Sequence, residues 1–237
     1  MQRTCSSYMM SVYNFYTSDL AFAINHNFTN WVKSCISMLA MARANAFPEI
    51  DFSHFKLYQP STLLRLANIQ SHSRNSFLAP LKEIALQTYQ TVHMAMIRQK
   101  ESMLKDLTSG EFQKSYLRTM RKRPADVVIH WNIVSDISDE ALFPKSRRPL
   151  ITPPVTVVSV RAVEVYFAKE DPKLGHRLVI QALVKFDVSQ SVKLTDREGR
   201  TVGDESGEPH RVVQYLILEK VGWYDSPWRF KEQVYRS

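Results

Sequence analysis

The chain has 237 residues, a formal net charge of +8 and 44% apolar residues. That length fits one large domain or a small domain with an extension, and the apolar content is sufficient for a core. The positive balance favours nucleic acid or an anionic membrane surface as partner, without choosing between them. Its two cysteines, Cys5 and Cys35, suggest neither a disulfide framework nor a zinc site. No apolar run approaches the ~20 residues of a membrane-spanning helix, so we expect a soluble or peripheral protein.

Residues 1–78 are predicted to form a partly helical N-terminal extension. The first 60 residues are rich in Met, Phe, Tyr and Asn and poor in charge. A short helical stripe is formed by Val32, Ile36, Leu39 and Ala40, and residues 61–70 favour a second short helix. We interpret the region as an arm that requires a partner surface for full order. A helical hairpin packed on the domain is the alternative.

Two helices are predicted next. Pro80 suits the first position of a helix, and apolar side chains follow it at spacings of three and four up to Met96, which indicates an amphipathic helix. Thr108-Ser109-Gly110-Glu111 has the spacing of a capping box and predicts the start of the second helix. Cations in its last turn and Pro124 predict its end.

The remainder of the chain has the pattern of antiparallel strands. Strands are predicted over 127–134, 155–167, 176–194, 212–221 and 228–234. Between 176 and 194 the even positions are apolar, apart from Gln190, and the odd positions are largely polar, which predicts a sheet with one buried face. Gln190 interrupts the apolar row and predicts a bend or bulge. Gly199 supplies the left-handed residue of a tight turn over Asp196–Arg200.

Helices followed by strands predict an α+β fold. The simplest assembly for residues 79–237 is a domain in which two or three helices pack on a curved antiparallel sheet of four to five strands.

Motifs of catalysis are mostly missing from the sequence. It contains no GxGxxG or GxxxxGK[ST] loop, no HExxH and no GxSxG. We therefore expect no catalytic residue, no cofactor and no metal site. A cone-shaped α+β fold could still enclose an acid–base pair, for which the candidates are His130, Asp136, Glu164 and His176. A small-molecule-binding or catalytic cone is kept as an alternative.

Basic residues cluster in three places and favour a polyanionic partner. Lysine and arginine neutralise phosphates without reading sequence. The predicted RNA-binding residues are Arg118, Arg121, Lys122 and Arg123; Lys145, Arg147 and Arg148 in a proline-flanked loop; and Arg229 and Lys231 beside Trp228 and Phe230.

Several segments resemble one protein family. They are Ile129-His130-Trp131, Ser159–Ala162, Ser191–Arg200, Val213–Lys220 and Pro227–Phe230. Together they are similar to the family that shares the C-terminal domain of translocase-of-inner-membrane subunit forty-four. Within that family, the mitochondrial large-ribosomal-subunit proteins and the fungal ribosome receptors are the most similar. The resemblance covers roughly 80–237.

The resemblance implies a cone-like domain related to nuclear transport factor two and a non-catalytic role. It implies a protein of the mitochondrial matrix, peripheral on the inner membrane, that holds the large ribosomal subunit near its polypeptide exit. Nascent membrane proteins would then meet the insertase. Trp31 and Lys33 are predicted to face the anionic membrane surface. A matrix-side anchor of the protein import motor is the alternative within the family.

Overall fold

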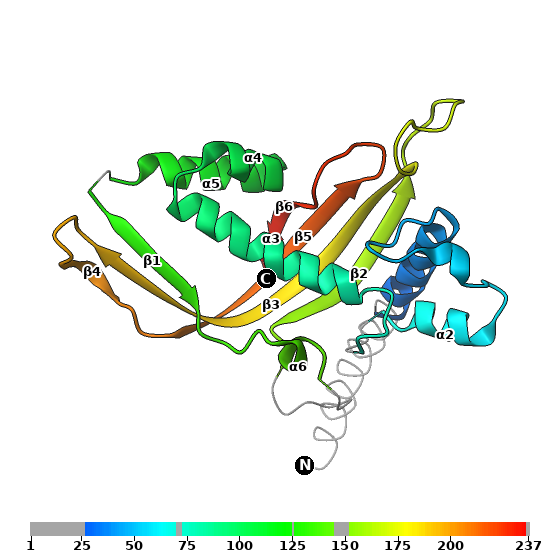
Figure 1. Cartoon of the computed structure of the whole chain (residues 1–237), viewed down its shortest axis with the longest axis horizontal. Helices are drawn as coiled ribbons and strands as arrows, with labels where there is room; N and C mark the ends of the chain where they lie inside the picture. Colours follow the sequence, from blue (N-terminus) through cyan, green and yellow to red (C-terminus); the bar gives the residue numbers. More distant parts are fainter. Residues whose placement is uncertain (1–26, 70–72, 125, 145–151, 236–237) are drawn as a thin grey trace, which may run out of the picture.

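The computed structural model describes residues 27–69, 73–124, 126–144 and 152–235. It is an α+β fold in which helices pack on an open, curved antiparallel sheet, as predicted (Figure 1). Within the described residues the sheet has six strands. They are β1 (Val128–Ile133), β2 (Val155–Glu164), β3 (Leu178–Thr195), β4 (Thr201–Ser206), β5 (His210–Val221) and β6 (Arg229–Val234).

Strand β3 organises the sheet because its 18 residues pair with four other strands. Its first half lies between β2 and β5, and its last residues lie between β1 and β4. Strand β6 extends the sheet beyond β5. The predicted strands correspond to all of these except β4. The sequence favours β4 weakly because Gly203, Asp204 and Glu205 have low strand propensity.

The alternation in β3 has the predicted consequence. The even residues from Leu178 to Val188 are all buried, and this face lies against the helices. The strand continues through Gln190 without a register irregularity at that residue, so of the predicted bend or bulge the bulge is wrong and the bend stays a prediction. The side chain of Gln190 instead accepts a hydrogen bond from Trp131 Nε1 at 2.6 Å, which satisfies its polar group inside the apolar row. The turn that ends β3 is confirmed, with Gly199 at φ +82°.

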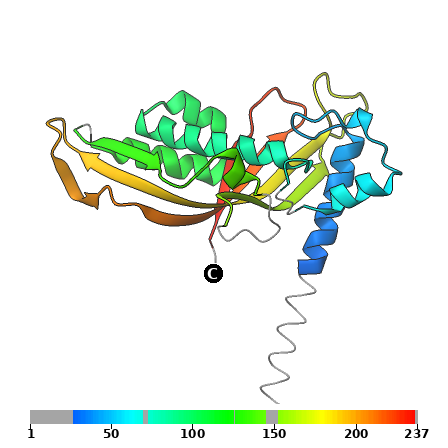
Figure 2. The ribbon, with the colours of Figure 1, turned by 60° about the horizontal axis from the view of Figure 1, so that its bottom comes forward.

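Three helices cover one face of the sheet: α3 (Ala79–Ile97), α4 (Glu101–Leu107) and α5 (Gly110–Lys122) (Figure 2). Helix α3 begins with Pro80 in its first turn and buries Leu81, Ala85, Tyr89 and Val92, as predicted. The capping box predicted before α5 does not form. Ser109 is the N-cap but makes no side-chain capping bond, and the hydroxyl of Thr108 donates to Leu104 O in the preceding helix.

The described part of the N-terminal region packs on the domain. A helix over 27–43, the short helix η1 (Phe52–His54) and α2 (Pro60–Ala67) lie at one end of the sheet (Figure 1). Met38, Met41, Phe47 and Phe52 belong to the same core cluster as the sheet residues. This arrangement agrees with the packed helical alternative for residues 27–67. The boundary between 1–78 and 79–237 stays a prediction.

The helix over 27–43 packs only part of the predicted stripe against the core, namely Leu39 and Ala40. The side chain of Ile36 is 61% exposed, whereas Met38, Met41 and Ala42 are buried. Ser34 and Ser37 share the buried side, where their hydroxyls donate to carbonyls one turn earlier, Asn30 O and Lys33 O. Small polar side chains can be buried in this way because the backbone satisfies them. The prediction is therefore wrong for Ile36, and the buried side of the helix is centred on residues outside the predicted stripe.

Candidate nucleic-acid interface and exposed apolar surface

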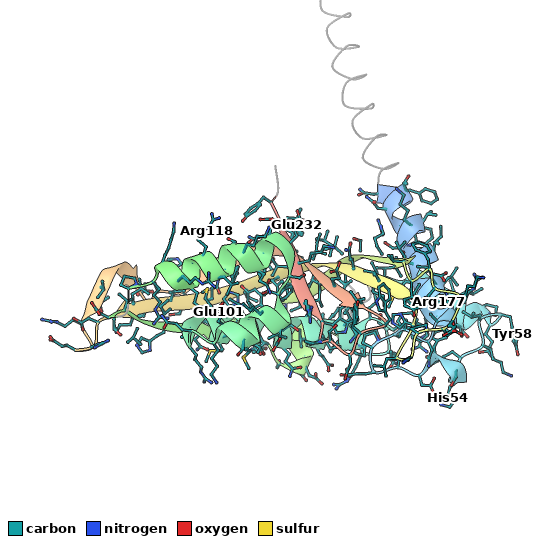
Figure 3. The ribbon with its side chains drawn as sticks, turned by 90° about the horizontal axis from the view of Figure 1, so that it is seen from above. His54, Tyr58, Glu101, Arg118, Arg177 and Glu232 are labelled. Carbon is teal, nitrogen blue, oxygen red and sulfur yellow. The ribbon has the colours of Figure 1, made fainter. Side chains whose placement is uncertain are left out.

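Helix α5 presents part of the first predicted basic cluster to solvent. Arg118 and Lys122 are exposed, and Figure 3 shows Arg118 pointing away from the helices. Arg121 pairs with Glu101 at 2.8 Å, and its side chain remains 65% exposed. An exposed ion pair of this kind is weak enough to exchange its carboxylate for a phosphate.

Arg123 has a structural role that the sequence did not reveal. Its Nε donates to Val127 O at 2.9 Å, and its Nη1 donates to Ile97 O at 2.8 Å. The guanidinium thus ties the end of α3 to the segment that enters β1. These bonds occupy its donors, so Arg123 is poorly suited to contact RNA.

The cluster on β6 lies beside α5. Ser109 N, just before α5, donates to Phe230 O at 2.8 Å, and the rings of Phe112 and Phe230 are 5.8 Å apart. Lys231 pairs with Glu219 at 2.6 Å. The fold therefore packs the start of α5 against β6, about 110 residues later in the sequence, and we call the cations of these two elements the basic surface. Three predicted residues, Lys145, Arg147 and Arg148, lie outside the described residues.

An exposed apolar surface lies at the other end of the molecule. Phe28 is 60% exposed and stacks on Trp31, with ring centroids 5.9 Å apart. Trp31 is 46% exposed, and its indole nitrogen donates to Ala67 O at 3.0 Å, which fixes the ring against α2. Ile36 and, on α2, Leu64 extend the exposed apolar side chains. We call Phe28, Trp31, Ile36 and Leu64 the apolar surface.

The apolar surface also carries positive charge. Lys33 is exposed on the same helix. The helix is held to β2 by Arg161, whose guanidinium donates to Ser34 Oγ at 2.6 Å and to Asn30 Oδ1 at 3.0 Å. None of the helices in the described ranges has the length and apolar composition needed to cross a bilayer.

The four acid–base candidates are not brought together. His130 is paired with Lys193 and Glu164 with Leu178 on β3, so 15 residues of strand, about 50 Å, separate them. His130 is exposed and bonds Thr195 Oγ1 at 3.1 Å. Glu164 is exposed at the end of β2.

His176 lies near Gly222, where burial and the charge of Lys220 lower its pKa. Asp136 caps Ser138 N at 2.9 Å, and that bond lowers its pKa.

Aromatic side chains fill the space between α3 and the sheet. Phe186 is fully buried and stacks on Tyr89, with centroids 4.5 Å apart. His93 is stacked on Trp131 at 4.7 Å, and its Nδ1 lies 2.9 Å from Tyr89 O. Burial lowers the pKa of His93 against the opposing effect of that bond, so the ring is neutral at physiological pH. These residues pack a core at the position where a catalytic cone would hold substrate.

One ionic cluster was not identified from the sequence. The side chain of Asp187 is only 2% exposed and pairs with Lys185 at 2.8 Å and with Arg211 at 2.7 Å. These bonds, led by the one from Arg211, lower the pKa of Asp187 to about 2. The sequence did contain a signal for this cluster. Lys185 and Asp187 are two residues apart on the polar row of β3, so their side chains share one face of the sheet.

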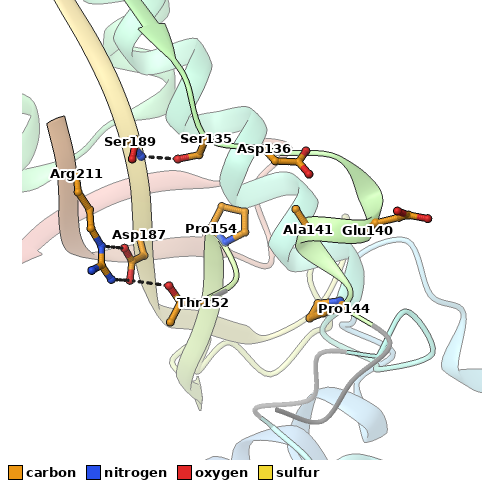
Figure 4. Close-up of a pocket in the computed structure, with 10 residues that line it drawn as sticks. All are labelled: Ser135, Asp136, Glu140, Ala141, Pro144, Thr152, Pro154, Asp187, Ser189 and Arg211. Carbon is orange, nitrogen blue, oxygen red and sulfur yellow. Dashed lines mark hydrogen bonds and ion pairs between the residues drawn. The ribbon is translucent and has the colours of Figure 1, made fainter. Parts of the chain in front are cut away.

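The Asp187 cluster lines a cavity of about 820 Å³ (Figure 4). Arg211 and Thr152 stand on one side, and Asp136 and Glu140 on the other. Asp187 is held in this wall by Arg211 and Lys185, whereas Asp136 and Glu140 lie across the cavity from it.

Comparison with family models gives no match, and no curated protein matches the chain. Among solved structures, the intermembrane-space region of the chloroplast protein ARC6 is similar at 12% sequence identity with a TM-score of 0.36. The similarity covers 65% of this chain and 94% of that one.

Proposed function

We propose that this protein is a non-catalytic tether that attaches the mitochondrial large ribosomal subunit to the inner membrane near the polypeptide exit. In this role it lies in the matrix, peripheral to the membrane. It positions the ribosome so that nascent membrane proteins reach the insertase.

The observation that carries the proposal is the exposure of large apolar side chains on the outer side of the helix over 27–43, in addition to those it buries. A helix in a folded domain normally turns its apolar stripe to the core. Here Phe28 and Ile36 are 60% and 61% exposed, while Met38 and Met41 fill the buried side together with two serines. Large exposed apolar groups of this kind mark contact surfaces for proteins or membranes.

Aromatic and basic side chains favour a membrane as the partner of the apolar surface. Tryptophan prefers the interface between lipid headgroups and acyl chains, and an interfacial helix buries its apolar face in that region. Lys33 adds attraction to anionic lipid, for which each cation contributes about 1 kcal/mol. Such attachment is reversible, as a tether requires.

The basic surface on α5 and β6 supports the ribosomal half of the proposal. Arg118 and Lys122 are exposed, and Arg229 and Lys231 lie on the adjacent strand. Phosphate contacts by such residues give salt-dependent affinity without base reading. In Figure 3, Arg118 on α5 lies well away from the N-terminal helix and from Tyr58, so a ribosome and a membrane can be contacted at the same time.

Two binding assays test the proposal on the full chain. Flotation with phosphatidylcholine vesicles, with and without cardiolipin, measures membrane binding, and co-sedimentation with mitochondrial large subunits measures ribosome binding. We expect Phe28→Glu with Ile36→Glu to abolish flotation and spare co-sedimentation. Phe167→Glu is the matched control, because Phe167 is 86% exposed on the β2–β3 connection.

The complementary variant is Arg118→Glu with Lys122→Glu, which should release the protein from ribosomes and spare flotation. Lys169→Glu with Lys173→Glu makes the same charge change on the exposed β2–β3 connection and should leave both assays unchanged. Arg147→Glu with Arg148→Glu should also weaken ribosome binding. Retention of a matrix chaperone in place of ribosomes would refute the tether and favour the import-motor role.

A further inference from the structure

A cavity of about 460 Å³ lies between the start of α5 and the β5–β6 connection. Ser109, just before α5, and Arg229, the first residue of β6, both line it. Glu219, Asp225 and Ser226 complete its polar wall. The cavity is distinct from the one beside Asp187, and it contains Arg229 of the basic surface described above.

Two residues that line this cavity each have a buried, unpaired polar atom. Within the described residues, Ser109 Oγ and Arg229 Nε are the buried side-chain nitrogen or oxygen atoms that lack a hydrogen-bond partner. Buried polar groups are almost always paired, because an unmade bond costs about 1–3 kcal/mol. That both exceptions line one cavity indicates that a group outside this chain completes them.

The neighbouring carboxylates do not satisfy Arg229. Glu219 stands directly opposite it in the β5–β6 pairing. Its carboxylate, however, binds Lys231 Nζ and Gln181 Nε2, each at 2.6 Å. The guanidinium of Arg229 is left without an ion pair among the described residues, although a carboxylate lies on the adjacent strand.

A second cation lies close to Arg229. Burial lowers the pKa of Lys220, and the charge of Arg229 lowers it further against the opposing effect of Asp225. The ammonium of Lys220 donates to Ser226 O on the cavity wall. The lining carries Arg229 and the carboxylates of Glu219 and Asp225, and with the neighbouring Lys220 and Lys231 the cations outnumber the acids by one. A positive excess suits an anion whose oxygens accept hydrogen bonds.

We propose that this cavity binds a phosphate of an RNA backbone, with Arg229 as the charged donor and the Ser109 hydroxyl as a second donor. The proposal rests on the proposed function, since it assigns a contact point on the same polyanionic partner. RNA is favoured over other phosphates because the cavity lies at the start of α5, the helix that carries the exposed Arg118 and Lys122. An arginine–phosphate contact fixes position and carries no sequence information.

The test follows two probes on the full chain, inorganic phosphate and a generic RNA hairpin. In NMR titrations, phosphate should shift the Arg229 Nε–H and Ser109 amide resonances, and Arg229→Gln should abolish the Ser109 shift. In a salt series, Arg229→Gln should weaken hairpin binding roughly tenfold and reduce the salt slope by about 1. Ser109→Ala should weaken it less. Arg229→Lys keeps the charge and should restore the slope but not the full affinity.

Arg197→Gln is the control, because it removes an exposed charge at the β3–β4 turn; it should leave the phosphate-induced shifts intact. Equal melting temperatures of wild type and Arg229→Gln would exclude unfolding as the cause of lost binding. Unchanged affinity and slope in Arg229→Gln would overturn the cavity assignment and leave the tether standing. No RNA binding by the wild type would overturn the ribosomal role itself. Displacement of phosphate by cardiolipin vesicles but not by the hairpin would refute RNA as the partner.

Discussion

Replacement of Asp187 by asparagine tests how much the ionic cluster on β3 stabilises the fold. Asparagine keeps the size of the side chain and removes its charge. Lys185 and Arg211 then lose their common carboxylate, while their own side chains remain 26% and 64% exposed. Water can partly resolvate both cations, so the loss should be smaller than for a fully buried pair.

The size of the effect follows from the pKa of Asp187. Its value falls from 3.8 to about 2 on folding. A difference of this size corresponds to roughly 2 kcal/mol of stability. Because the folded-state pKa is the lower one, this stability is present above pH 3.8 and is lost as the pH falls toward 2. For a chain of this length the change corresponds to a decrease in Tm of roughly 4–8 °C at neutral pH.

Urea unfolding of wild type and Asp187→Asn measures the difference in unfolding free energy. At pH 7 we expect Asp187→Asn to be less stable by roughly 2 kcal/mol, and the difference should shrink below pH 3.8. Carbon-detected NMR of the Asp187 carboxyl group provides a second readout that does not depend on unfolding. As a control, Asp171→Asn removes a carboxylate whose side chain is 90% exposed and paired with Arg177, and it should cost almost nothing.

A destabilisation that stays constant from pH 7 to pH 2 would refute the electrostatic reasoning, because the loss would then arise from packing or from the hydrogen bonds alone. An Asp187 pKa at or above 3.8 would refute it independently.

Three further predictions concern the aromatic core, two glycines and two arginines. Phe186→Ala should lower the unfolding free energy by about 3–5 kcal/mol, because this fully buried ring stacks on Tyr89. Urea titration measures the difference, and a decrease below about 1 kcal/mol would mean that the aromatic core is loosely packed. Gly222→Ala should lower Tm more than Gly199→Ala does. A Cβ at 222 would lie 2.1 Å from His176 Nδ1, whereas at 199 it meets nothing within 4 Å and only the positive φ is strained. Arg123→Gln should lower Tm and leave the RNA affinity unchanged, whereas Arg118→Gln should lower the RNA affinity and leave Tm unchanged. Similar effects of the two substitutions would show that exposure does not separate the roles of these arginines.

Local sequence determined the regular elements of the domain. The alternation along β3 and the three- and four-residue spacing after Pro80 each depend on neighbours close in the chain, and both elements form where predicted. Gly199 fixes its turn because glycine adopts a positive φ without a steric cost. The apparent capping box failed because Thr108 found a partner in the helix that precedes it.

Only the tertiary structure decided which surfaces are free to bind. The helix over 27–43 could bury either side, and its contacts with Arg161 and Ala67, far along the chain, select the side that carries Ser34 and Ser37. Likewise, Arg123 and Arg118 belong to the same basic cluster in the sequence. In the structure the carbonyls of Val127 and Ile97 bind Arg123, whereas Arg118 is exposed to solvent. Ser109 and Arg229 line one cavity because α5 packs on β6. A sequence pattern shows the periodicity of one helix or strand. Whether a side chain is free to bind a partner depends on its contacts with residues that are distant in the sequence.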